Sequence, residues 1–288
     1  MRLRVLIVRV LTRTFVPAKR IVCKLTFWRR LVARLEWLRD WPKLARLPVS
    51  WSMRDISIWR EITRVRYDLQ VHMLRLLFEQ PMIFAVWLLA FLISLSVHEF
   101  AHALIGNYLG DQTAKRLGRL TLNPAAHVDP LGLLTVTLIG FGWGKPVPYN
   151  PYNLRWPKWG PVAIAFAGPT SNLILAVSSA VAFGFIAPHL GITNLLSIFL
   201  MVFAQINIAL FAFNLVPLPP LDGSKLLLAT LSAPKYHDIR NFIETKGSML
   251  LLILVIVDSF ANLGIFSSFI NFASQIVLGI ADGVTRLI

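Results

Sequence analysis

Long runs without charged side chains limit the fold of this chain more than any other feature. Residues 82–107, 161–187 and 191–221 are almost free of Asp, Glu, Lys and Arg, and residues 248–281 contain only Asp258. A helix needs about 20 apolar residues to cross a bilayer, so each run is long enough to span one. Only 15% of all residues are charged, whereas soluble proteins carry about 25%. The uncharged runs and the low charged fraction therefore indicate a membrane protein.

These runs predict an all-α polytopic membrane protein with a bundle of about four to five transmembrane helices. The count depends on residues 248–281, which can form two spans broken near residues 262–264, or one span and an interfacial helix. A shorter apolar stretch, 131–141, alternates Val and Thr with larger apolar residues and leads into a glycine-rich sequence. It predicts a small membrane-associated β-hairpin or a re-entrant segment.

The basic residues divide the chain into two parts. Residues 1–80 hold 18 of the 29 Lys and Arg residues and 6 of the 14 acidic ones, a net charge of +12, whereas the other 208 residues have a net charge of +3. Arg and Trp mixed with Leu and Val suit an anionic membrane surface better than nucleic acid. We therefore predict a basic amphipathic N-terminal extension over 1–80, a transmembrane domain over 81–288 and no nucleic-acid partner.

The first apolar run contains the sequence His-Glu-Phe-Ala-His at residues 98–102. On a helix, positions i and i+4 lie on one face, so the imidazoles of His98 and His102 can reach one metal ion. Glu99 lies beside that face, where its carboxylate can take a proton from a water molecule activated by zinc. Ionisable groups inside a span cost roughly 2.5–3.5 kcal/mol each. We therefore favour a metal site over polar side chains satisfied by neighbouring helices.

A catalytic zinc site uses three protein ligands and keeps a fourth position open. Asp222 follows an uncharged run whose last residues, 217–221, include three prolines. Prolines break a helix, and a membrane tolerates the break only where the backbone is buried or lines a cavity. Asp222 can therefore point inward as the third ligand, or it can be a helix N-cap at the membrane edge. The other acidic candidates are Asp111, Asp129, Asp238, Asp258 and Asp282.

The two motifs together resemble the site-2 protease family of intramembrane zinc metalloproteases. The resemblance rests on His-Glu-x-x-His in the first span and on Asn-x-x-Pro-x-x-x-Leu-Asp-Gly at residues 214–223, and it extends over about 82–235. Further motifs, LNPAAHVDPLG, GWGKPVPYNPYNLR and AGPTSN, resemble the compact bacterial branch, without inserted PDZ-like or appended CBS-like domains. The resemblance implies that His98, His102 and Asp222 hold one zinc ion per chain and that Glu99 is the general base.

Three further polar residues are weaker candidates. Asn172 and Asn214 can hold the substrate backbone or an oxyanion, or they can form hydrogen bonds between helices. His127, in the loop after the first span, can approach the metal or stabilise an oxyanion, or it can make a structural hydrogen bond. The segment 133–150 can offer a strand edge to an extended substrate or only cover the cavity.

The sequence thus predicts an intramembrane zinc metalloprotease that hydrolyses peptide bonds within or near transmembrane segments of single-span membrane proteins. The alternatives are a catalytically inactive homologue that acts as a scaffold and a metal transporter. If the loops 109–160 and 214–247 and the C-terminus are cytosolic, all 11 basic residues after position 80 obey the positive-inside rule. We therefore expect a multi-pass protein of the bacterial plasma membrane with its site nearer the cytosol. Residues 1–80 do not fit this layout, because one span would place their 18 basic residues on the far side. The oligomeric state stays open.

Overall fold

The computed structural model describes residues 73–139, 142–261 and 263–287, all of which belong to one unit of the chain, Val49–Ile288. Most of the N-terminal extension predicted over 1–80 lies outside the described residues. In chain order the elements are α5 (Met73–Glu79), α6 (Pro81–Tyr108), α7 (Thr113–Arg116), α8 (Pro124–His127), α9 (Pro130–Ile139), η3 (Pro151–Asn153), α10 (Gly160–Leu190), α11 (Leu195–Asn214), α12 (Gly223–Thr230), η4 (Pro234–Tyr236), α13 (His237–Ala261) and α14 (Ile265–Leu287). Within the described ranges the protein is helical and contains no sheet.

Three of the described helices, α6, α10 and α11, are long and apolar enough to cross a membrane. They match the first three uncharged runs of the sequence. Proline occupies the first turn of both α6 and α10, where its missing N–H removes no helical hydrogen bond. Asn194 caps the start of α11: its side-chain oxygen accepts a hydrogen bond from the Leu196 N–H at 2.9 Å.

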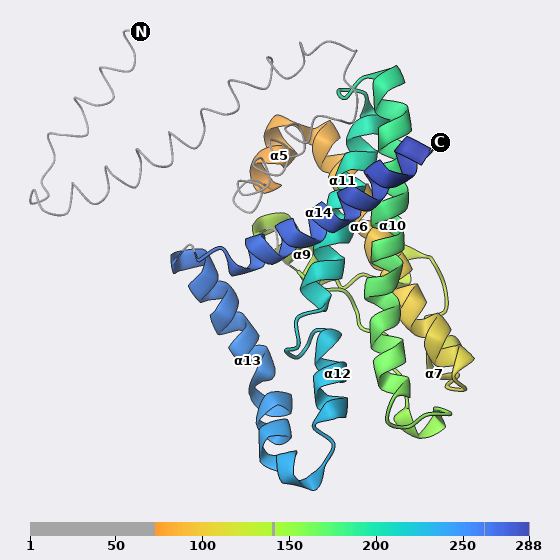
Figure 1. Cartoon of the computed structure of the whole chain (residues 1–288), viewed down its shortest axis with the longest axis vertical. Helices are drawn as coiled ribbons and strands as arrows, with labels where there is room; N and C mark the ends of the chain where they lie inside the picture. The colour runs from red at the N-terminus through yellow and green to blue at the C-terminus, as the bar shows by residue number, and fades with distance from the viewer. Residues whose placement is uncertain (1–72, 140–141, 262, 288) are drawn as a thin grey trace, which may run out of the picture. The chain divides into compact units, whose positions relative to one another are not determined.

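The same three helices pack against one another, and α14 packs against α10 and α11 (Figure 1). Small side chains dominate this contact, which allows the helix backbones to approach closely. The buried core consists of Ala176 and Ala180 from α10, Ala204, Ile208 and Ala212 from α11, and Ala273 and Val277 from α14.

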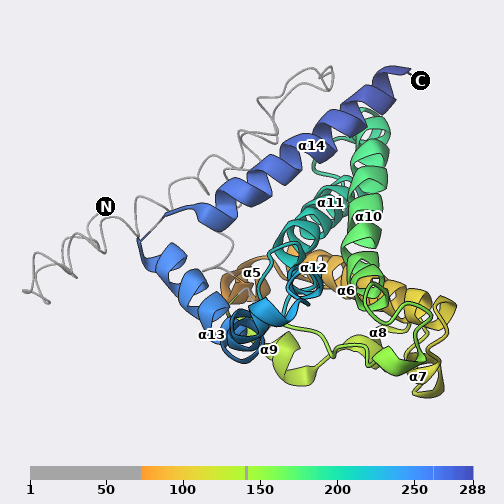
Figure 2. The same cartoon turned by 60° about the horizontal axis from the view of Figure 1, so that its bottom comes forward.

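The third uncharged run does not stay helical to its end. α11 stops at Asn214, and the proline-containing segment 215–221 forms tight turns before α12 begins. Gly223 permits this path, because a Cβ on it would overlap the backbone carbonyl of Leu215. The break leaves Asp222 at the start of α12, a helix that packs against α10 (Figure 2).

The predicted break in the last apolar run is present, between α13 and α14. Gly264 turns the chain there with φ +71°, a conformation that glycine adopts without strain. Asp258 accepts a hydrogen bond from the Ile265 N–H at 2.7 Å and so caps α14. Neither helix is among the three long apolar ones, although Ile265–Ile280 forms a shorter apolar stretch. The described residues therefore contain three helices that are long and apolar enough to cross a membrane, and a total of four to five spans stays a prediction.

The expected β-hairpin is not found in the described residues. Residues 130–139 form helix α9, and the described extended chain makes one isolated antiparallel bridge, between Val128 and Gly144. Asp129 caps α9 by accepting hydrogen bonds from two backbone N–H groups of its first turn at 2.9 Å each. Thr135 and Thr137 donate their hydroxyls to carbonyls three and four residues earlier. These local bonds allow β-branched residues to remain helical.

Candidate metal centre

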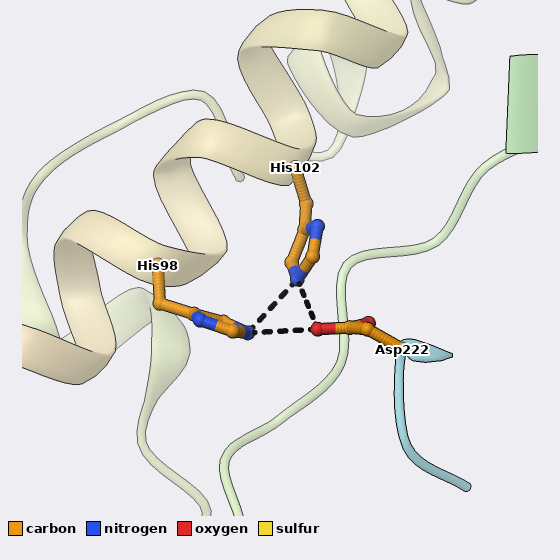
Figure 3. Close-up of side chains that lie close together, drawn as sticks. All are labelled: His98, His102 and Asp222. Atoms are coloured by element: carbon orange, nitrogen blue, oxygen red, sulfur yellow. Dashed lines mark hydrogen bonds and ion pairs between the residues drawn. The ribbon is translucent and has the colours of Figure 1, made fainter. Parts of the chain in front are cut away.

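Two histidines and one aspartate converge between α6 and the start of α12. His98 and His102 lie one turn apart on α6, and Asp222 stands at the start of α12 (Figure 3). The two Nε2 atoms are 2.9 Å apart, and Asp222 Oδ2 lies 3.2 Å from the first and 3.3 Å from the second. Both histidines are buried, and the aspartate side chain is 20% exposed. The fold thus brings together three ligand atoms from segments about 120 residues apart in sequence.

The other ring nitrogen of His102 fixes which atom faces the centre. Nδ1 lies 2.7 Å from the backbone carbonyl oxygen of Ile164 on α10. A carbonyl oxygen only accepts hydrogen bonds, so Nδ1 must carry the proton. A neutral His102 therefore presents an unprotonated Nε2 to its two neighbours, the form that binds a metal.

His98 is oriented in the same way by a side chain. Its Nδ1 lies 2.5 Å from Oδ1 of Asn172, which is fully buried on α10. An amide oxygen also only accepts, so the proton again lies on Nδ1 and the lone pair on Nε2. The two imidazoles thus turn equivalent lone pairs toward the same point.

Three acceptor atoms facing one another without a proton between them would repel. Asp222 Oδ2 is buried and has no hydrogen-bond donor within the described residues. A cation removes the conflict, and two imidazole nitrogens with one carboxylate oxygen are a donor set that suits zinc. Among the described residues, these three form the one group of His, Cys, Asp and Glu side chains that could hold a metal ion. The residues present therefore fit a zinc ion, with His98, His102 and Asp222 as the residues that would hold it.

Gly168 provides the space beside the two rings. A Cβ on this residue would lie 2.5 Å from His102 Nε2 and 2.6 Å from His98 Cε1, closer than real side-chain contacts allow. Gly168 and Asn172 are one turn apart on α10 and therefore share a face. That helix face thus gives the imidazoles both room and a hydrogen-bond acceptor.

Glu99 lies beside the three ligands and contacts a loop. Its carboxylate is buried, and Oε2 accepts a hydrogen bond from the Val147 N–H at 3.2 Å. Val147 belongs to the extended segment 142–150, which we call the strap. The strap therefore reaches the carboxylate that the sequence predicts to be the general base.

Arg119 and His127 hold the strap in place. The His127 carbonyl accepts from the Lys145 N–H at 2.7 Å, and Arg119 donates to the Lys145 carbonyl. Burial lowers the pKa of Arg119, while the negative charge of Glu99 raises it in part. The arginine thus brings a positive charge into the surroundings of Glu99.

His127 and Asn214 lie outside the group of three ligands. His127 is fully buried, with Nε2 2.7 Å from the Thr121 carbonyl and Nδ1 3.5 Å from Arg119 Nη2, so both ring nitrogens have protein partners. Asn214 donates to the Leu210 carbonyl at 3.0 Å in the last turn of α11. Neither contact requires a substrate, and a role in binding one stays a prediction. Asn172 contacts His98, so its position favours orienting a ligand over holding substrate.

Two residues of the site were not identified from the sequence. Asn207, on α11, lies fully buried against Asn172, and Arg119 supports the strap. An asparagine within an uncharged span does predict a hydrogen bond to another helix, because amides in spans usually bond to a neighbouring helix. Nothing in the sequence, however, indicates which helix that partner is on.

Similarities to known proteins agree with this geometry. The sequence model described as Peptidase family M50 matches residues 187–257. The chain is 37% identical over 172 residues to "Putative zinc metalloprotease YwhC" of Bacillus subtilis, a match that covers 57% of this chain and 77% of that protein. It is 29% identical over 154 residues to "Putative zinc metalloprotease Rip2" of Mycolicibacterium smegmatis and over 147 residues to Rip2 of Mycobacterium tuberculosis, covering 49% of this chain and 55% of each relative. No solved structure matches the chain significantly.

A helical bundle with membrane-crossing helices and a buried group of two histidines and one aspartate defines an integral membrane protein of the zinc-metalloprotease type. The chain belongs to Peptidase family M50, the site-2 protease family. This membership confirms the resemblance seen in the sequence motifs, and zinc is the metal that the family and the donor atoms both indicate.

Proposed function

We propose that this protein is an intramembrane zinc metalloprotease in which His98, His102 and Asp222 hold one zinc ion and Glu99 is the general base. The observation that carries the proposal is the convergence of two imidazole lone pairs and one buried carboxylate oxygen within 4.8 Å of one another. An inactive homologue would lack the base or a ligand, and this chain has all four residues.

Zinc held there would supply Lewis acidity, which makes water acidic enough to ionise near neutral pH and polarises a peptide carbonyl. The Glu99 carboxylate takes the proton from the attacking water at one oxygen and transfers it to the leaving nitrogen. The Val147 N–H donates a hydrogen bond to the other oxygen, so the Glu99 carboxylate is already oriented before substrate binds. Arg119 stabilises the carboxylate through its charge.

The substrates in this proposal are single-span membrane proteins, cut within or near the transmembrane segment. The support is the location of His98, Glu99 and His102 on α6, a helix apolar enough to lie in a bilayer. A substrate helix bonds its own carbonyls internally, so it must unwind locally before a carbonyl can reach the site. The strap, which contacts Glu99 through Val147, offers extended chain for such a peptide to follow.

The proposed location is the bacterial plasma membrane, with the site nearer the cytosol. The three ligands lie in the second half of α6 and at the start of α12, close to the loops 109–160 and 214–247. These loops carry 10 of the 11 basic residues that follow position 80, as the positive-inside rule expects of cytosolic loops. The relatives reported above are bacterial proteins. Residues 81–288 form the protease domain in this proposal, and 1–80 form a surface extension.

The test uses purified protein in liposomes with a panel of single-span substrates. We expect cleavage that stops when a chelator removes zinc and returns when zinc is added back. Glu99→Gln, which fills the same volume, is the matched inactive control. Cleavage that continues without metal, or in the Glu99→Gln variant, would overturn the proposal.

A further inference from the structure

A buried chain of side-chain hydrogen bonds runs from His98 to the middle of α11. Asn172 Nδ2 donates to Asn207 Oδ1 at 2.8 Å. Asn207 Nδ2 in turn donates to the Phe203 carbonyl and to the Ser94 hydroxyl, both at 2.8 Å. Asn172, Asn207 and Ser94 are all fully buried. The chain therefore connects α10, α11 and α6 behind the metal centre.

The far end of this chain fixes its direction. The Phe203 carbonyl only accepts, so the nitrogen of the Asn207 amide must face it and the oxygen must face Asn172. The Ser94 hydroxyl donates to the Ala90 carbonyl at 2.7 Å, which leaves its oxygen free to accept from the same nitrogen. Two independent acceptors thus impose one orientation on Asn207.

The orientation of the Asn207 amide determines the orientation of the Asn172 amide. Because Asn207 presents its oxygen, Asn172 must present its nitrogen there and its own oxygen to His98. The His98 ring must then donate from Nδ1, at 2.5 Å. Its Nε2 is left with a lone pair at the point where the three ligand atoms meet. If Asn207 were reversed, Asn172 would reverse too and would offer His98 a donor in place of an acceptor.

We infer that Asn207 is a positioning residue for the metal centre: through Asn172 it keeps the proton of His98 on Nδ1 and so keeps Nε2 available to zinc. This inference rests on the metal site of the proposed function but not on proteolysis. In this inference the hydrogen bond between Asn172 and Asn207 does more than join α10 to α11: it also orients a metal ligand.

The first test measures zinc affinity of the purified full chain by competition with a chelator. Asn207→Leu removes the acceptor for Asn172 while keeping a similar volume. Loss of an outer-shell partner typically weakens metal binding about 10–100-fold, and we expect a loss in that range. Gln205→Leu is the control on the same helix, because its side-chain nitrogen has no hydrogen-bond partner within the described residues. It should leave zinc affinity unchanged.

A second control tests whether the loss of any hydrogen bond between α10 and α11 would weaken zinc binding. Ser179 donates to the Leu200 carbonyl at 2.7 Å and so also joins α10 to α11, but it does not touch the chain leading to His98. Ser179→Ala should leave zinc affinity unchanged. The visible absorption of the Co²⁺-loaded protein reports ligand geometry, and only Asn207→Leu should alter it.

The decisive test repeats Asn207→Leu in an Asn172→Asp background. A carboxylate has only acceptor oxygens, so it accepts the His98 Nδ1 proton whichever group stands at position 207. The loss caused by Asn207→Leu should therefore largely disappear. The same loss in both backgrounds would mean that Asn207 acts only through packing, and no loss in either would also overturn the inference.

A further pair of variants keeps the inference testable if Asn207→Leu fails to fold. Asn172→Asp retains an acceptor for His98, although its second oxygen faces the Asn207 oxygen, and it should bind zinc more tightly than Asn172→Leu, which should lose about 10–100-fold in affinity. Equal affinities in this pair would refute the inference. Normal zinc binding without cleavage would refute the proposed protease function and leave the role of Asn207 intact. A chain that binds no zinc would overturn both.

Discussion

Gly168 faces His102 so closely that a Cβ on the glycine would lie 2.5 Å from the imidazole Nε2. The metal centre therefore requires glycine at this position, because a Cβ at residue 168 would overlap the imidazole ring of His102. Gly168→Ala should displace the ring at a cost of about 1–3 kcal/mol, as overpacking does in well-packed sites. Chelator competition should show zinc binding weakened by roughly 5- to 150-fold.

The matched control for this prediction is Gly279→Ala on α14. A Cβ there meets nothing within 4 Å, so zinc affinity should not change. Equal affinities of the Gly168→Ala variant and the unmodified protein would show that the site tolerates the added methyl group.

Glu99→Gln should bind zinc as before and lose catalysis. Glutamine fills the same volume and can still accept from the Val147 N–H, but it cannot take a proton from water at neutral pH. Loss of a general base typically reduces the rate by about 10²–10⁴-fold. Cleavage assays paired with metal analysis on the same preparation check both halves, and a variant that keeps most of its activity would exclude Glu99 as the base.

Asp222→Ala should lower the zinc content well below one per chain, because only the two imidazoles would remain. Asp129→Ala and Asp258→Ala should keep full stoichiometry, although each removes a helix cap and should lower unfolding stability by about 1 kcal/mol. Metal analysis of the three variants identifies the metal ligand, and their thermal unfolding identifies the helix caps. Equal zinc content in all three would remove Asp222 from the ligand set.

Asp111 should make stability depend on pH. Burial alone would raise its pKa, but hydrogen bonds to the carboxylate lower the pKa below its usual value. The donors are the Thr113 N–H and hydroxyl, the Asn153 amide and the Asn150 N–H. A lowered folded-state pKa stabilises the fold above about pH 4, and this contribution is lost as the pH falls through the folded-state value.

Asp111→Asn should therefore destabilise the protein at pH 7 by about 1.5–3 kcal/mol, the usual value of hydrogen bonds to a charged group. The difference from the unmodified protein should shrink as the pH falls below about 4. Asp238→Asn, at an exposed position in the first turn of α13, is the control. A difference that stays constant down to pH 3 would contradict the ionic origin of the effect.

A chain starting at Met73 should insert, bind zinc and cleave. Every proposed ligand and the proposed base lie after this residue, and the first described helix, α5, begins there. The net charge of +12 on residues 1–80 suits contact with a membrane surface. Normal insertion with lost zinc or activity would reveal a direct role for the basic extension.

Short-range features of the sequence determined a large part of the site. The i, i+4 spacing of His98 and His102 places both imidazoles on one helix face wherever the helix lies. The prolines after Asn214 end α11 for a local reason, the missing N–H and the fixed φ angle. Asp222 could therefore be singled out before its neighbours in space were known. The apolar runs located α6 and α10 within a few residues, whereas α11 ends at Asn214, before the end of the run 191–221.

Alternation of residue types was less informative for residues 131–141. It predicted a β-hairpin or a re-entrant segment, and residues 130–139 form a helix, α9, which Asp129 caps and in which two threonine hydroxyls bond to backbone carbonyls. Periodicity over so few residues cannot separate a short helix from a strand. The capping aspartate followed by proline was the better local signal.

Only the tertiary structure decided how α10 and α11 are placed around α6. That placement turns Asn172 toward His98 and Asn207 toward Asn172, and it sets Gly168 against both imidazoles. It likewise brings the Val147 N–H to Glu99 across 48 positions of sequence. The sequence determines the faces of each helix because side-chain direction follows the helical repeat. The rotation and depth of one helix against another depend on the packing of all of them, so the partners of the ligands emerge only from the assembled bundle.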